Sequence, residues 1–104
     1  MAHPKAVPVA LNGSTKYLVY DFNALCALLD EGVDAFRLSD TDLQDVRVIR
    51  KLVWAGLLES EPSVTLAQVG SWLDLSNLVA VAEAFTAAFA RSSKSRLADP
   101  GDPQ

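Results

Sequence analysis

Apolar residues recur three or four positions apart in four stretches of the chain, the spacing that places them on one face of a helix. These stretches cover residues 22–31, 41–58, 66–73 and 77–90. In the longest of them, Ile49, Val53 and Leu57 follow one another along a single stripe. The pattern therefore predicts four helices.

A β-hairpin is predicted ahead of the helices, at about residues 7–20. Two β-leaning runs flank Asn12 and Gly13, and these residue types accept the positive φ angles that a tight hairpin turn requires. Pro8 cannot donate a ladder hydrogen bond, so the first strand is expected at an edge. The expected fold is mainly α with a small N-terminal β-hairpin (α+β), with four helices in a compact single domain.

Capping residues mark three of the helix starts. Asp21 stands where an N-cap is expected, and Gly32 supplies a C-terminal stop for the same helix. The sequences Thr41–Gln44 and Thr65–Gln68 both have the spacing of a capping box, in which each side chain satisfies a free backbone amide. We expect both of the helices that follow to be capped in this way.

The hydrophobic core is expected to join two helical stripes to one face of the hairpin, because a single domain is stable only when its apolar faces cover one another. The predicted core residues are Leu18, Tyr20, Phe22, Leu25, Leu29, Leu43, Val46, Ile49, Val53 and Leu57. Cys26 lies on the same stripe as Leu25 and Leu29 and is expected to be a buried structural thiol.

The length of 104 residues suits one domain. A polar, proline-bearing leader at residues 1–6 is expected to be mobile. Residues 91–104 are mostly serine, charged residues, proline and glycine, with too little apolar area to offset the entropy of ordering. We therefore expect a single globular domain over residues 7–90, followed by a flexible tail over residues 91–104.

The charge balance argues against nucleic acid as a partner. Nine basic and thirteen acidic side chains give a net charge of −4, whereas binding to phosphates needs a basic surface. Residues 65–90 have the outline of a helix-turn-helix, yet they contain two acids and no lysine or arginine. No charge-free stretch approaches the roughly 20 apolar residues that span a bilayer. Neither nucleic acid nor a membrane is an expected partner.

Candidate chemistry is sparse, and no enzyme is expected. Cys26 is the only cysteine, and the only histidine, His3, lies in the leader, so a histidine-activated thiol is not expected. Nitrogen and sulfur donors are too few for a zinc site, and the five glycines form no phosphate-binding loop. No catalytic residue, cofactor or metal is predicted. A single cysteine and no signal segment favour a reducing cytoplasm.

The final helix is unusual on the side opposite its apolar stripe. That side holds Ala80, Ala84 and Ala87, with Ala88 beside them, and Glu83 is the only charge in the helix body. A surface helix normally has a charged outer face, so this one is buried, or covered by a partner, or simply exposes alanine methyl groups. These interpretations stay open. The residues expected to form a partner surface are Trp54, Trp72, Ala80, Ala84, Ala87 and Ala88.

Several segments together suggest a family. They are Lys16–Phe22, Ala24–Leu28, Leu52–Leu58, Thr65–Leu73 and the alanine-rich helix that follows. In this pattern, which spans roughly residues 15–90, the chain resembles the small tail assembly chaperones of long-tailed bacteriophages, prophages and gene transfer agents. The similarity lies in hydrophobic spacing, in the Ala-Gly-Leu sequence that ends the long helix and in the Thr-Leu sequence that opens the next.

The resemblance implies a non-enzymatic protein of the host bacterial cytoplasm that binds the long, helical tape measure protein. It would shield the apolar surface of that protein until tail tube subunits polymerise around it and would then leave, so it is expected to be absent from the mature virion. Tail tube subunits are further candidate partners. Many members of the family also have a longer form made by ribosomal frameshifting. The oligomeric state stays open.

Two other functions stay open at the level of the sequence. One is a small structural adaptor or ring-forming protein of a virion or another assembly, which would need a large self-complementary interface. The other is an acidic regulator that binds another protein.

Overall fold

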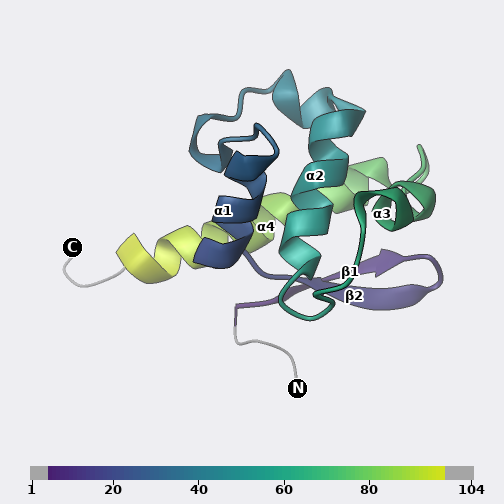
Figure 1. The fold of residues 1–104 in the computed structure, drawn as a ribbon, viewed down its shortest axis with the longest axis horizontal. Helices are drawn as coiled ribbons and strands as arrows, with labels where there is room; N and C mark the ends of the chain where they lie inside the picture. The colour runs from purple at the N-terminus through teal and green to yellow at the C-terminus, as the bar shows by residue number, and fades with distance from the viewer. Residues whose placement is uncertain (1–4, 98–104) are drawn as a thin grey trace.

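The computed structural model describes residues 5–97, with side chains over residues 5–91. Within that range a two-stranded antiparallel hairpin precedes four helices (Figure 1). The elements are β1 (Val7–Leu11), β2 (Ser14–Leu18), α1 (Phe22–Asp30), α2 (Val46–Leu57), α3 (Leu66–Trp72) and α4 (Leu78–Leu97). Between α1 and α2 lie two short 3₁₀ helices, η1 (Ala35–Arg37) and η2 (Asp42–Gln44). The predicted α+β fold of one hairpin and four helices is confirmed.

The hairpin turns at the predicted dipeptide. Strands β1 and β2 pair antiparallel with Leu11 opposite Ser14, and Asn12 and Gly13 between them have φ angles of 53° and 76°. Glycine enters this left-handed region without a steric cost, and asparagine tolerates it better than most residues. Alternation along β1 buries every second residue, so one face of the hairpin joins the core.

Helix α2 occupies the middle of the molecule. In Figure 1, α1 and α3 flank it, the hairpin lies beneath it, and α4 runs behind them along the longest axis. Helix α2 packs against α1, α3, α4 and β2, and α4 packs against both strands of the hairpin. The core therefore lies where these elements meet, and Leu18, Leu52, Val53 and Val81 are among its fully buried side chains.

Tyr20 joins the end of the hairpin to α2 and α4. Its buried hydroxyl donates a hydrogen bond to the Leu52 carbonyl, and its ring meets Phe85 edge to face at 5.2 Å. Burial raises the pKa of this phenol, so it stays protonated. Gly56 permits the close approach, because a Cβ there would lie 2.7 Å from the Tyr20 hydroxyl oxygen. The glycine of the Ala-Gly-Leu sequence thus has a packing role.

The predicted core of α2 and the hairpin is largely confirmed. The residues that are buried as predicted are Leu18, Tyr20, Ile49, Val53 and Leu57, and those that are half-buried against the core are Leu25 and Leu43. The prediction is wrong for Val46, which is 59% exposed. Val46 begins α2, and no other element covers its side chain at that end of the helix.

The side of α1 that faces the core is rotated from the one predicted, and the two sides share only Leu25. Ala24 and Leu28, four residues apart, are its buried residues. The core prediction is wrong for Phe22 and Leu29, which are 74% and 58% exposed. It is also wrong for Cys26, whose thiol is exposed and not a buried structural group. Phe22, Cys26 and Leu29 share the outward side of the helix, and we refer to them as the α1 stripe.

The two threonine–glutamine sequences fold differently. Thr65 and Gln68 form the predicted capping box: the Gln68 amide donates to Thr65 Oγ1 at 3.1 Å, and the Thr65 amide donates to Gln68 Oε1 at 2.9 Å. The prediction for Thr41 is wrong, because its side chain caps nothing and η2 forms there instead. Helix α2 begins later, after Asp45, whose carboxylate accepts from the Arg47 amide at 2.9 Å. A nearby carboxylate therefore provides the N-cap.

Helix α4 is longer than predicted. It continues to Leu97, so the prediction of a flexible tail is wrong for residues 91–97. The Arg91 guanidinium donates to the Ala6 carbonyl at 2.6 Å and links the helix to the chain before β1. Residues 1–4 of the predicted leader and 98–104 of the predicted tail lie outside the described residues.

Candidate functional site

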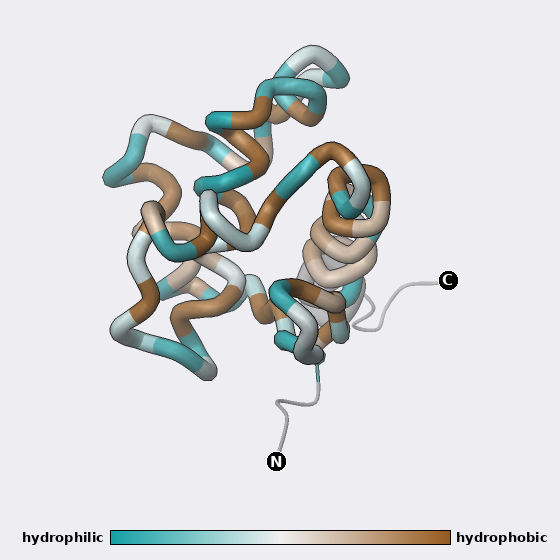
Figure 2. The backbone as a smooth tube through the Cα atoms, turned by 90° about the vertical axis from the view of Figure 1, so that its right-hand side faces the viewer, coloured by the Kyte–Doolittle hydropathy of each residue, from teal (hydrophilic) through white to brown (hydrophobic). Residues whose placement is uncertain are grey.

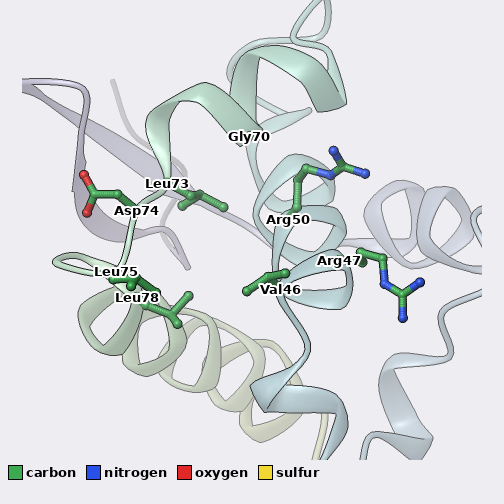
Figure 3. Close-up of a pocket in the computed structure, with 8 residues that line it drawn as sticks. All are labelled: Val46, Arg47, Arg50, Gly70, Leu73, Asp74, Leu75 and Leu78. Carbon is green, nitrogen blue, oxygen red and sulfur yellow. The ribbon is translucent and has the colours of Figure 1, made fainter.

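An open apolar groove lies between the first turns of α2, the end of α3 and the joint that leads into α4. Its volume is about 410 Å³, within the range of ligand-binding clefts. The residues that line it are Val46, Arg47, Arg50, Gly70, Leu73, Asp74, Leu75 and Leu78 (Figure 3). We refer to these eight residues as the α2–α4 groove.

The walls of the α2–α4 groove are valine and leucine side chains that are open to solvent. Figure 3 shows Val46 on α2 across the gap from Leu75 and Leu78, with Leu73 at the end of α3. Leu75 is 85% exposed and Val46 is 59% exposed. Single exposed apolar residues are common, but several gathered in one hollow indicate an interaction surface.

Hydrogen bonds within the α3–α4 joint leave Leu75 on the outside. Asn77 Nδ2 donates to the Trp72 carbonyl at 2.9 Å, and the Asp74 amide donates to Asn77 Oδ1 at 3.0 Å. The Asp74 carboxylate accepts from the Ser76 hydroxyl and from the amides of Ser76 and Asn77. These bonds, the one from the Ser76 hydroxyl above all, hold the pKa of Asp74 below its ordinary value. The polar residues of the joint thus bond to one another around an exposed leucine.

Two arginines form the charged rim of the α2–α4 groove. Their guanidinium groups lie on the α2 side, away from the leucines of the joint (Figure 3). Arg47 pairs with Asp45 at 3.4 Å, and hydrogen bonds from Arg47 hold the pKa of that carboxyl below its ordinary value. The Arg50 Cδ lies 3.2 Å from where a Cβ on Gly70 would be. The glycine therefore lets the Arg50 side chain lie against α3.

The outer side of α4 is a further exposed and mainly apolar surface. A second, shallower hollow of about 460 Å³ runs along this helix. It is lined by Val79, Ala82, Glu83, Thr86, Ala87 and Ala90, and we refer to these residues as the α4 outer face. Val79 is 70% exposed, and Figure 2 shows few hydrophilic positions along this part of the helix. Leu78 of the groove and Val79 of the outer face are consecutive residues of α4, so the two hollows are neighbours on this helix.

The four alanines of the predicted partner surface divide between two sides of α4. Ala80 and Ala87 are exposed, and Ala87 belongs to the α4 outer face. Ala84 and Ala88 are buried, so the prediction that they are available to a partner is wrong. Both flank Phe85 on the side of the helix that packs against β1 and α2, and the fold covers that side.

Both tryptophans of the predicted partner surface are half-buried and already make contacts within the chain. Trp54 Nε1 donates to the Val64 carbonyl at 3.1 Å. The Lys16 ammonium lies 4.6 Å from the centre of the Trp72 ring, a cation–π contact. Neither tryptophan lines the α2–α4 groove or the α4 outer face. The structure therefore does not bring them together with the exposed alanines.

These surfaces offer apolar contact. Among the residues that the structure describes, no three histidine, cysteine, aspartate or glutamate side chains are grouped so that they could hold a metal ion. Over the same part of the chain, no helix combines the length and the apolar character needed to cross a membrane. The arrangement can bind the apolar side of another molecule, with two arginines at its edge to add polar contacts.

The α2–α4 groove is absent from the sequence-based predictions. Periodicity assigns Val46 to the core and gives Leu75 no role, because Leu75 stands alone among the turn-forming residues Asp74, Ser76 and Asn77. The position of Leu75 is the one signal in the sequence that could have indicated the groove. A large apolar residue within a turn does not belong to the apolar stripe of a helix, so it is a candidate for an exposed contact. Which residues face it depends on how α2 approaches the joint, and spacing along the chain does not reveal that.

Comparison of the chain with protein-family models, curated proteins and solved structures finds no match. These comparisons therefore assign neither a family nor a function. The functional argument rests on the surfaces of the molecule and on the motifs of its sequence.

Proposed function

We propose that this protein binds an apolar helix of another protein and acts as a non-enzymatic tail assembly chaperone for a tape measure protein. The observation that carries the proposal is the solvent-exposed α2–α4 groove, which lies next to the α4 outer face along the chain. Leu75, Val79 and Val46 are 85%, 70% and 59% exposed. Large apolar groups gathered in a hollow gain free energy when a partner removes them from water.

A long apolar helix suits both surfaces. A groove between helices accepts an amphipathic helix through side chains three, four and seven residues apart. The α4 outer face has mostly small side chains and a single acid, Glu83, so a second helix can approach it closely. The resemblance in sequence adds the proposed partner, because a tape measure protein is long and helical and its apolar surface needs cover before the tail tube forms.

Co-expression with the tape measure protein of the same tail gene cluster tests the proposal. The wild-type chain is expected to keep that protein soluble and to co-purify with it. Leu75→Glu places a charge at an 85% exposed position of the groove. We expect the recovery of tape measure protein to fall at least about tenfold, because a charge buried without a partner opposes binding. Ala87→Glu tests the α4 outer face in the same assay and is expected to reduce recovery less.

Leu29→Glu is the matched control for Leu75→Glu. Leu29 is 58% exposed and belongs to the α1 stripe, so the same charge is introduced away from the groove. Both variants are expected to keep the wild-type circular dichroism spectrum. A tape measure protein that is equally insoluble with and without the wild-type chain would contradict the proposed function. Equal recovery with Leu75→Glu and with wild type would show that the groove is not the contact.

A second candidate function is a structural adaptor that joins two molecules in an assembly. The observation that favours it is the α1 stripe, a second exposed apolar surface at which Phe22 is 74% exposed. A subunit held in a ring needs two complementary interfaces. Size-exclusion chromatography with light scattering distinguishes the two functions. A defined oligomer that Leu29→Glu dissociates would favour the adaptor, whereas a monomer would favour the chaperone.

A further inference from the structure

We propose that the α2–α4 groove selects a partner helix that carries an acidic side chain beside its apolar stripe, and that this carboxylate pairs with Arg50. The inference rests on the proposed function and adds the chemistry of the bound segment. In this arrangement apolar side chains of the partner would lie between Val46 and Leu75, and an aspartate or glutamate on the side of the partner that faces α2 would meet the arginine rim (Figure 3).

Arg50 is the cation of the groove that lacks a partner. Its Nε is buried and has no hydrogen-bond partner. The ion pairs that join described residues to one another use other cations, namely Lys16, Arg37, Arg47 and Lys51. The Nε is closed to solvent, but the two terminal nitrogens of the guanidinium also make no hydrogen bond with described residues. A carboxylate can accept two parallel hydrogen bonds from such a pair of donors. Arg50 therefore has donors that suit a carboxylate.

The other charged groups of the groove are already engaged. Arg47 pairs with Asp45 at 3.4 Å. Figure 3 shows the Asp74 carboxylate directed away from the groove, where it accepts hydrogen bonds from Ser76. The unpaired charge at the groove is therefore positive, on a protein whose net charge is −4. A helix with an acid beside its apolar stripe complements this arrangement.

Gly70 leaves room for the Arg50 side chain to pack against α3, which restricts its conformations before an anion binds. Because position 70 has no side chain, the Arg50 stem passes close to α3, with its Cδ 3.2 Å from where a Cβ would stand. A side chain that is packed along its stem loses less conformational freedom when its guanidinium binds. A partner helix that covers the groove also excludes water from this rim, which strengthens an ion pair formed there. Nucleic acid offers an anion too, but it brings many further phosphates against an acidic protein.

The test compares Arg50→Gln with Arg37→Gln in the full chain, with the tape measure protein as the probe. The Arg37 side chain is 85% exposed and lies outside the groove, so its substitution removes the same charge elsewhere. We expect the dissociation constant to rise about tenfold for Arg50→Gln and less than about twofold for Arg37→Gln. Arg50→Lys keeps the charge but lacks the paired donors that form two parallel hydrogen bonds with a carboxylate. We expect its affinity to lie between those of Arg50→Gln and wild type.

Salt dependence provides a readout that a loss of packing would not change. Raising the salt from about 0.1 M to about 1 M is expected to weaken the wild-type complex more than the Arg50→Gln complex, because only the first has this ion pair to screen. The substitution is expected to leave the melting temperature of the free chain near that of wild type, since the Arg50 Nε it removes has no partner there.

The outcomes separate the inference from the function on which it rests. Equal dissociation constants for Arg50→Gln and Arg37→Gln would overturn the carboxylate assignment and leave the proposed function intact. A wild-type chain that does not bind the tape measure protein would overturn the proposed function, and the inference with it. A free chain that is dimeric in light scattering and becomes monomeric on Arg50→Gln would assign the groove to a second copy and would also overturn the inference.

Discussion

The two sides of α4 are built from similar residues and have opposite surroundings. Phe85 and Ala88 face α2 and the hairpin and are buried, whereas Val79 and Ala87 face solvent. One residue step, about 100° around the helix, separates Ala87 from Ala88. Hydropathy distinguishes the two sides only weakly, because Glu83 and Thr86 are the polar residues of the exposed side between Leu78 and Ala90. The buried side stabilises the fold, and the exposed side is a mainly apolar surface that the fold leaves uncovered.

The largest expected effect comes from placing the same glutamate on each side. Ala88→Glu buries a carboxylate without a partner, and we expect the free energy of unfolding to fall by on the order of 5 kcal/mol or more, enough to unfold most of a small domain. Ala87→Glu is expected to change it by less than about 0.5 kcal/mol, because glutamate is a good helix former at an exposed position. Urea unfolding measures both changes, and equal stabilities would mean that the two sides do not differ.

Large side chains extend the comparison. Phe85 is 5% exposed and lies edge to face with Tyr20 at 5.2 Å, while Val79 on the same helix is 70% exposed. Phe85→Ala is expected to lower the free energy of unfolding by about 3–5 kcal/mol through a cavity and a lost ring contact. Val79→Ala is expected to lower it by less than about 0.5 kcal/mol. Similar losses in urea unfolding for the two variants would contradict the assignment of the buried side.

A glycine on the covered side of α2 gives an expected effect of intermediate size. Alanine is a better helix former than glycine by about 1 kcal/mol, so Gly56→Ala would stabilise an exposed helix. In this fold the new Cβ would lie 2.7 Å from the hydroxyl oxygen of Tyr20, which is buried and donates to the Leu52 carbonyl. We therefore expect a net loss of about 2 kcal/mol. A higher melting temperature for Gly56→Ala would show that the Tyr20 ring moves aside without cost.

Local signals predict the elements of this fold well. The hairpin turn depends on Asn12 and Gly13, and the start of α1 depends on Asp21, whose carboxylate accepts from the Ala24 amide at 2.9 Å. Both signals act over a few residues, so their effect does not depend on how the rest of the chain packs. The C-terminal end of α4 is harder to predict, because Arg91 reaches Ala6 at the other end of the chain.

The covered side of each helix is less predictable, and so is the candidate site. Apolar residues lie on both sides of α1, and periodicity alone favours Phe22 and Leu29 over the residues that the fold buries. The α2–α4 groove joins Val46, Arg50 and Leu75 from different elements. Their proximity depends on tertiary packing, which spacing along a single chain does not contain.

The smallest expected effect comes from the sequences Thr41–Gln44 and Thr65–Gln68. Like the two sides of α4, they are similar in sequence and have different surroundings in the fold, because only the second forms a capping box. Thr65→Ala removes the hydroxyl that accepts from the Gln68 amide at 3.1 Å. We expect the free energy of unfolding to fall by about 1 kcal/mol, the usual contribution of an N-cap. Thr41→Ala removes an exposed side chain that caps no helix, and a change below about 0.5 kcal/mol is expected.

Urea unfolding of both threonine variants under one set of conditions makes this a direct test of where α2 begins. Asp45 supplies the cap of that helix by accepting from the Arg47 amide at 2.9 Å, so Asp45→Ala is expected to reproduce the loss of about 1 kcal/mol that Thr41→Ala does not cause. If Thr41→Ala instead matches Thr65→Ala while Asp45→Ala has no effect, the helix begins at the threonine in solution, and the two sequences are equivalent after all.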